Sequence, residues 1–174
     1  MNRQTLFRIL AAITLVSLLV PAASAQEGEE VLTVRLVADI RNLDPAHWFS
    51  EYDKQVAMPL YSGLVRYQPG TYETELDLAE SIESSEDGTE IHFTLREGVQ
   101  CHGGYGELTA NDVKFSFERF LDPDNPSPYA DDWRPLERVE VTDTYEGTIV
   151  LSSAFAPLWN STLPLMAGSV VCGA

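Results

Sequence analysis

Short runs of alternating apolar and polar residues, separated by turn-forming residues, most limit what this chain can fold into. The alternation predicts strands at Val31–Asp39 and Thr89–Arg96, each with one apolar face. Ile82–Ser85 precedes the second strand across a Glu-Asp-Gly turn, which predicts a hairpin. Val139–Thr142 and Thr148–Ser152 predict another hairpin. We therefore expect a fold rich in antiparallel strand pairs.

Three short helices are expected between these strands. They are Tyr52–Tyr61, Ala110–Leu121, which Thr109 opens as an N-cap, and Ala156–Met166. The second helix presents an apolar stripe formed by Val113, Phe117, Phe120 and Leu121. A last strand is expected to start at Ser169–Cys172. This order of elements predicts an α+β, mixed α/β fold.

The first 25 residues have the three parts of a secretory signal peptide. Arg3 and Arg8 make the start positive, and Ile9–Val20 is an apolar run of 12 residues, shorter than the roughly 20 that span a bilayer. Ala23 and Ala25 then supply the small residues of a cleavage site before Gln26. A lipoprotein would need a cysteine at position 26, so we expect a periplasmic protein without a lipid anchor. An uncleaved anchor and a buried helix are the alternatives.

The charge of the chain excludes some partners. With 11 basic against 27 acidic residues its formal net charge is −16. Non-specific nucleic-acid binding and docking on anionic lipid both need clusters of Lys and Arg. We therefore expect neither nucleic acid nor an anionic membrane surface as a partner.

Enzymatic motifs are missing from the sequence. It contains no G-x-S-x-G elbow and no phosphate-binding loop. His47, His92 and His102 are too scattered to predict a metal site, and Cys101-His102 is a weak metal or redox candidate. We therefore expect no enzyme, no cofactor and no metal, and interpret the acidic residues as solvated surface.

Cys101 and Cys172 are the only cysteines, and export would place both in an oxidising compartment. One hypothesis is that they form a disulfide, which would close a loop of about 70 residues and stabilise the fold by roughly 4 kcal/mol. The alternative is two free thiols, because Cys172 lies close to the last residue of the sequence.

Several segments, read in order, resemble the bacterial extracellular solute-binding family 5, the dipeptide- and oligopeptide-binding proteins of ABC importers. The matching segments are Leu43-Asp44-Pro45, Leu60 to Val65, Asp77 to Ser81, Thr89 to Val99, Leu108 to Arg119, Ser127-Pro128-Tyr129 and the hairpin from Val139 to Leu151. Ile82, Cys101 and Pro59 depart from the family's pattern at packing positions. The resemblance implies the N-terminal part of a type II periplasmic-binding-protein fold.

The resemblance also implies a domain organisation. Residues 1–25 would be the signal peptide, and 26–51 the first strand and cleft loop of lobe I. Residues 52–166 would form a hairpin-rich accessory domain, and 167–174 would start the return strand to lobe I. Family members resemble two-lobed proteins of about 500 residues, so we expect this chain to be a fragment of a longer reading frame. A truncated gene is the alternative.

The function implied is that of a periplasmic substrate-binding component, a monomer that delivers peptides to a membrane permease. Other small solutes remain open. By resemblance, the residues that line the cleft, partly through backbone groups, are His47, Trp48, Phe49, Ser50 and Glu51. Core packing at the domain junction is the alternative interpretation of Trp48 and Phe49.

Two other classes of function compete with this one. The first is a remnant or interaction module that binds no ligand, and the second is an exported hydrolase. Several hundred further in-frame residues past Ala174 would favour the transporter subunit, whereas a genuine stop would favour the remnant. With one wall of the cleft missing, the isolated chain is expected to bind no peptide tightly.

Overall fold

The computed structural model describes residues 31–48 and 50–173. The chain divides into two units, Met1–Arg35 and Leu36–Ala174. Of the first, only residues 31–35 are described, and they contain no helix or strand. The predicted signal peptide and Phe49 lie outside the described residues. Within the described part of the chain, no helix is long and apolar enough to cross a membrane.

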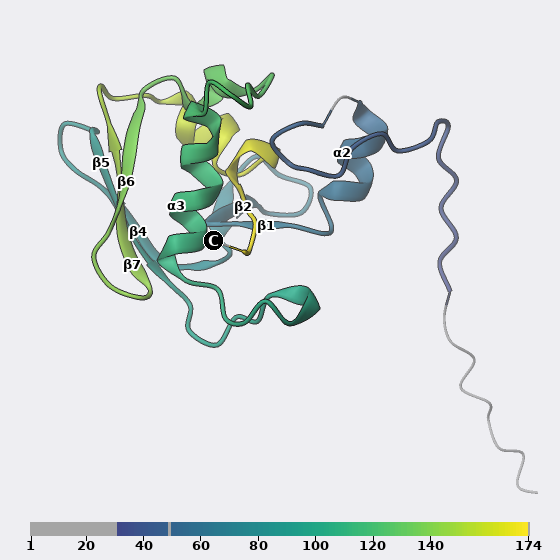
Figure 1. The fold of residues 1–174 in the computed structure, drawn as a ribbon, viewed down its shortest axis with the longest axis horizontal. Helices are drawn as coiled ribbons and strands as arrows, with labels where there is room; N and C mark the ends of the chain where they lie inside the picture. Colours follow the sequence, from purple (N-terminus) through teal and green to yellow (C-terminus); the bar gives the residue numbers. More distant parts are fainter. Residues whose placement is uncertain (1–30, 49, 174) are drawn as a thin grey trace, which may run out of the picture. The chain divides into compact units, whose positions relative to one another are not determined.

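A four-stranded antiparallel sheet forms the centre of the second unit (Figure 1). Its strands are β4 (Ala79–Ser84), β5 (Glu90–Leu95), β7 (Glu146–Leu151) and β6 (Leu136–Val141), in that spatial order. The two predicted hairpins are confirmed, and the pairing of β5 with β7 joins them into one sheet. Two hairpins distant in sequence thus share a continuous face.

That face is the core of the unit. Ile91, Phe93 and Leu95 alternate along β5 and are buried, as the pattern predicts. Phe93 lies opposite Gly147 in the register of β5 and β7. A Cβ at Gly147 would come within 2.6 Å of the Phe93 ring, so glycine makes room for the aromatic side chain.

Helix α3 (Ala110–Glu118) packs on β6 and covers this face (Figure 1). Val113 and Phe117 are fully buried, and the Phe117 ring stacks on Trp133 with a centroid distance of 4.3 Å. The predicted stripe is wrong at Leu121, which is 42% exposed. The reason is that the last turn, Arg119–Leu121, is a 3-10 helix, whose tighter winding rotates Leu121 away from the α-helical stripe.

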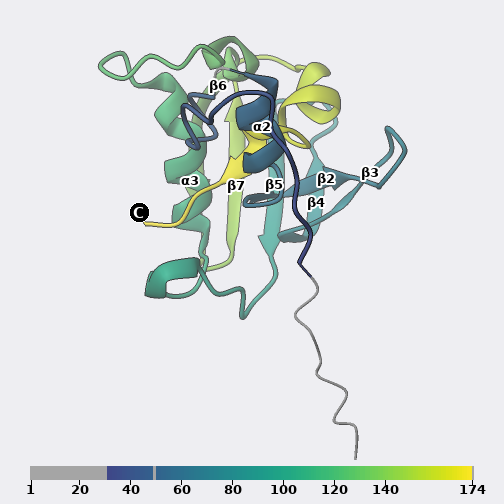
Figure 2. The ribbon, with the colours of Figure 1, turned by 90° about the vertical axis from the view of Figure 1, so that its right-hand side faces the viewer.

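The remaining regular elements are short. The strand β1 (Ser62–Gly63) pairs with β8 (Ser169–Val170), and β2 (Val65–Tyr67) pairs with β3 (Thr74–Leu76). Figure 2 shows this second pair projecting on the side opposite α3. Helix α2 spans Glu51–Ala57, and 3-10 turns span His102–Gly104, Ala130–Trp133 and Met166–Gly168. The helix expected at Tyr52–Tyr61 therefore forms, although it begins and ends earlier.

Two predicted elements are wrong. Residues 31–39 form no strand, and Leu32 and Val37 are 87% and 80% exposed. A strand needs a neighbouring backbone, and no described strand pairs with this segment. The helix expected at Ala156–Met166 is a single π-helical turn, Leu158–Thr162. Pro164 has no backbone N–H to donate, so it cannot continue the hydrogen bonds of the helix.

Cys101 and Cys172 form a disulfide, with their Cα atoms 6.1 Å apart. The bond links the loop before α3 to the segment that follows β8. The same segment contacts α3, because the Ser116 hydroxyl accepts a hydrogen bond from the Val171 N–H at 2.9 Å. The Asp112 carboxylate accepts a further bond from the Gly173 N–H at 3.1 Å.

The disulfide is testable in the purified chain. Mass spectrometry after alkylation without reduction should find no modified thiol. Reduction should lower the free energy of unfolding by about 4 kcal/mol, because it reopens a loop between cysteines 71 residues apart. A chain with both Cys101→Ala and Cys172→Ala is the control and should not respond to reductant. Two alkylated thiols in unreduced protein would contradict the bond.

Phe115 and Phe117 provide a matched test of the core. Phe117 is fully buried, and Phe115, on the same helix, is 44% exposed. Phe117→Ala should lower the free energy of unfolding by about 3–5 kcal/mol, because it leaves a cavity beside Trp133. Phe115→Ala should cost less than about 1 kcal/mol. Urea unfolding of both variants measures the difference, and equal losses would contradict the packing described.

Candidate functional site

The predicted cleft residues lie in and just after the loop of residues 41–50, which leads into α2. His47 and Trp48 are partly buried in this loop. Ser50 is the N-cap of α2, and its hydroxyl accepts a hydrogen bond from the Asp53 N–H at 3.2 Å. Glu51 is the first residue of the helix, with its side chain 72% exposed. Phe49 lies outside the described residues.

A local network of hydrogen bonds shapes the turn that carries His47. The side-chain oxygen of Asn42 accepts a bond from the Asp44 N–H, and the Asp44 carboxylate accepts one from the Ala46 N–H, both at 2.9 Å. The His47 N–H in turn donates to the Asp44 carbonyl at 2.9 Å. Asn and Asp side chains favour turns because they bind the backbone two residues on in this way.

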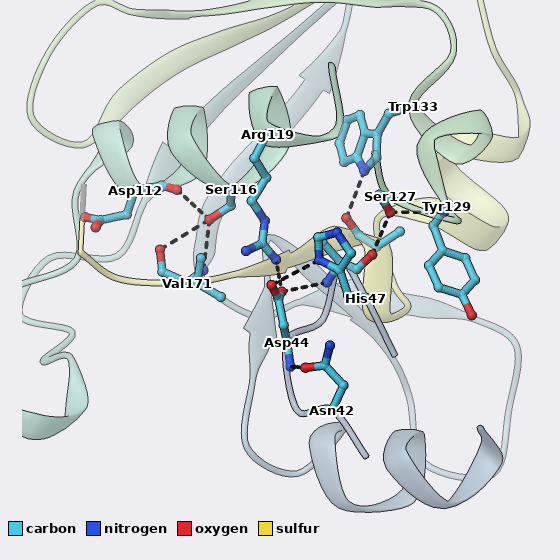
Figure 3. A network of polar contacts seen from close by, with 12 residues as sticks. Asn42, Asp44, His47, Asp112, Ser116, Arg119, Ser127, Tyr129, Trp133 and Val171 are labelled. Carbon is cyan, nitrogen blue, oxygen red and sulfur yellow. Dashed lines mark hydrogen bonds and ion pairs between the residues drawn. The ribbon is translucent and has the colours of Figure 1, made fainter. Parts of the chain in front are cut away.

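The Asp44 carboxylate is also the centre of an ionic cluster (Figure 3). The Arg119 guanidinium donates to one of its oxygens at 2.5 Å, and His47 Nδ1 lies 3.2 Å from the other. Burial by itself would raise the pKa of Asp44. The bond from Ala46, the charge of Arg119 and the contact with His47 outweigh burial and hold the Asp44 pKa below its usual value.

Two side chains from the loop between α3 and β6 hold the same segment. The Ser127 hydroxyl donates to the Ala46 carbonyl at 2.6 Å, and the Tyr129 hydroxyl donates to the Trp48 carbonyl at 3.1 Å. The Tyr129 ring also stacks on the Trp48 indole, with centroids 4.6 Å apart and planes 10° from parallel. Burial, together with the nearby charges of Asp132 and Glu51, raises the pKa of Tyr129.

The surroundings of Trp48 contain features of packing and of a contact surface. Tyr129 stacks on its ring, and the Lys54 ammonium lies 5.7 Å from the ring centroid. Three buried nitrogens around the loop have no hydrogen-bond partner in the described part of the chain: His47 Nε2, Trp48 Nε1 and Arg119 Nε. Buried polar atoms normally have partners. The loop and Arg119 therefore keep hydrogen-bonding capacity that contacts among the described residues do not use.

Two cavities in the described part of the chain lie away from this loop. One, of about 390 Å³, is lined by Leu60, Tyr105 and both cysteines among others, and a second, of about 330 Å³, includes Arg66 and Asp77. Neither is lined by residues 41–51. Among the described residues, no group of three or more His, Cys, Asp and Glu side chains is placed to hold a metal ion.

Sequence reasoning missed the side chains that fix the loop: Asp44, Arg119, Ser127 and Tyr129. Asp44 and Arg119 are 75 residues apart, and no local pattern connects them. The sequence indicates Leu43-Asp44-Pro45 and Ser127-Pro128-Tyr129 only as segments of a family resemblance. The pairing of Tyr129 with Trp48 follows from the tertiary fold, which brings the loop against the segment after α3.

The lowered pKa of Asp44 makes a testable contribution to stability. The carboxylate favours the folded state at pH above about 3.9, its ordinary value, and this contribution is lost as pH falls through the lower folded pKa. Asp44→Asn should therefore reduce the free energy of unfolding at pH 7 by up to about 1 kcal/mol, since the pair is partly exposed. Urea titrations should show the difference shrinking below pH 4. A difference that is constant down to pH 2 would contradict the assignment.

Comparison with known proteins shows which protein family this chain is similar to. The sequence profile described as "Bacterial extracellular solute-binding proteins, family 5 Middle" matches residues 73–171. The di/tripeptide-binding protein 2 of Pseudomonas aeruginosa is 36% identical over 153 residues, which is 78% of this chain and 29% of that protein. The mixed α/β fold matches solved periplasmic binding proteins of the type II fold.

Two solved structures show the extent of the likeness. MoaA of A. tumefaciens R10, in complex with mannopinic acid, is 33% identical with a TM-score of 0.72, and the match covers 77% of this chain and 28% of that one. DppA of Helicobacter pylori, in complex with the peptide STSA, is 29% identical with a TM-score of 0.67, covering 77% and 29%. The chain thus spans about three-tenths of the length of these relatives. It belongs to the bacterial extracellular solute-binding proteins of family 5, which are binding proteins and not enzymes.

Proposed function

We propose that the chain is part of the periplasmic substrate-binding component of an ABC importer, and that peptides are its solutes. Two similar proteins support this choice, because one is named as a di/tripeptide-binding protein and the other holds a peptide in its structure. Mannopinic acid in a further relative keeps other small solutes as the alternative. The component would act as a monomer that hands its solute to a membrane permease.

The proposal rests mainly on one observation about the loop of residues 41–50. Arg119, Ser127 and Tyr129 hold this loop against the rest of the folded unit. A rigid segment with unused donors is suited to form one wall of a cleft. In this proposal His47, Trp48, Phe49, Ser50 and Glu51 line that wall. Small-ligand sites enclose most of the ligand surface. The second wall would come from parts of a family member that this chain does not include.

The proposed domain organisation follows from the same comparison. Residues 1–25 would be a signal peptide cleaved before Gln26, without lipid attachment, and residues 26–51 would contribute to lobe I. Residues 52–166 would form the accessory domain, and 167–174 would return to lobe I. The exposed apolar side chains of residues 31–37 support this, since a neighbouring strand of a two-lobed protein can cover them.

A module that binds no solute is the second candidate. It is favoured by the compact unit of residues 36–174, which has its own buried core. This candidate requires no second wall and no permease.

Isothermal titration calorimetry with a panel of di- and tripeptides separates the two candidates. The 174-residue chain should show no binding at micromolar concentration, because a single wall leaves the polar groups of a peptide in water. A chimera in which residues 36–173 replace the matched segment of the Pseudomonas relative should bind peptide. Circular dichroism and a thermal melt establish that each protein is folded.

Two results would contradict the proposal. Micromolar or tighter binding by the chain alone would show that it forms a complete site. A folded chimera that binds none of the peptides, while the intact Pseudomonas protein binds them in the same buffer, would show that these residues supply no working wall.

A further inference from the structure

Three side chains from other segments bind the loop of residues 41–50 at every second residue, namely at Asp44, Ala46 and Trp48. Arg119 contacts the side chain of Asp44, and Ser127 and Tyr129 bind the carbonyls of Ala46 and Trp48. Figure 3 shows the side chains of Arg119 and Ser127 pointing toward the stretch of backbone that carries Asp44 and His47. We propose that Arg119 is a positioning residue of the solute site: through Asp44 it sets the orientation of His47 and Trp48.

Asp44 is the point at which the loop's own turn meets the rest of the fold. Its carboxylate accepts bonds from the Ala46 N–H and Arg119 and contacts His47 Nδ1. The Arg119 side chain is only 17% exposed, so it has little freedom to take another orientation. Charge-assisted bonds of this kind are about twice as strong as neutral ones. Removing the guanidinium would leave the Asp44 carboxylate with only its contacts to Ala46 and His47, and the turn would lose its ionic bond to the end of α3.

Trp48 is the residue through which this change would reach a solute. Its ring stacks on Tyr129, and its carbonyl accepts the Tyr129 hydroxyl, so ring and backbone are both fixed by one tyrosine. That geometry depends on the path of the chain from Asp44 to Trp48. If the turn at 44–47 relaxes, the two rings can no longer remain 10° from parallel.

Arg119 is separable from the core that stabilises the unit. It is the C-cap of α3, two residues beyond the buried Phe117 and six beyond the buried Val113. Its guanidinium points to the loop, as Figure 3 shows, and lies 5.9 Å from the Phe120 ring centroid. A glutamine at this position keeps the length of the stem near the backbone and loses the charge. The unit should therefore stay folded in Arg119→Gln.

The chain contains three tryptophans, which give a direct readout. In protein labelled with ¹⁵N at the indole nitrogen, the signal missing from Trp48→Phe identifies Trp48. Arg119→Gln should shift or broaden the Trp48 signal, whereas Trp159 should keep its position. Arg119→Lys should restore the Trp48 signal in part, because it keeps the charge without the planar fork. Arg138→Gln, which removes a 51% exposed arginine paired with Glu137 and Glu140, is the matched control.

Two outcomes would overturn the positioning role. A Trp48 signal unchanged in Arg119→Gln would show that the loop does not depend on the ion pair. Equal shifts of all three signals, together with a large fall in melting temperature, would show a merely structural role.

The inference rests on the proposed function, and its test separates the two. In the peptide-binding chimera, Arg119→Gln should weaken peptide affinity by about tenfold, and Arg138→Gln should leave it unchanged. Equal affinities in both variants would overturn the inference even if the Trp48 signal moves. A chimera that binds no peptide in any variant, with the Trp48 signal still shifted by Arg119→Gln, would instead reject the proposed function.

Discussion

Burial of one face of the β4-β5-β7-β6 sheet under α3 is the interaction on which the rest of the structure depends. A sheet with a single apolar face must be covered, and a helix laid on it is one of the few stable solutions. Phe93, Phe117 and Trp133 provide much of that contact and are almost completely removed from solvent. The direction of α3 is thereby fixed, and so is the position of its last residues. Arg119 reaches Asp44 because the core has already placed the end of the helix.

The loop of residues 41–50 is therefore held both by its own hydrogen bonds and by contacts with other segments of the chain. Its internal turn bonds fix the local shape, and contacts from the segments after α3 fix where that shape lies. Helix α2 continues the loop through the Ser50 N-cap, whose capping box with Asp53 satisfies donors at the helix start. Each of these contacts is modest by itself. Together they hold residues 42–48, which form no helix or strand, against Arg119, Ser127 and Tyr129.

Local patterns in the sequence predicted the parts of the fold that local forces determine. The hairpins around residues 82–95 and 136–151 follow from alternation and turn residues, and the start of α3 follows from its Thr109 N-cap. Where the prediction failed, the structure is determined by contacts between residues that are distant in sequence. Residues 31–39 alternate between apolar and polar side chains as a strand does, but this pattern does not by itself provide a neighbouring strand with which to pair. The Asp44–Arg119 pair and the Trp48–Tyr129 stack join residues far apart in sequence, so only the folded chain brings them together.

The β1–β8 pair has a consequence for how the chain acquires its structure. Ser62 and Val170 lie near opposite ends of the folded unit's sequence, yet they are direct neighbours in the register. Contacts between distant residues form slowly, because the chain loses much entropy before they give any stabilisation. The two hairpins can form early from neighbouring residues, whereas closure at β1 and β8 needs nearly all of the unit to be synthesised. The β1–β8 contact therefore stays open longer than the two hairpins while the chain folds.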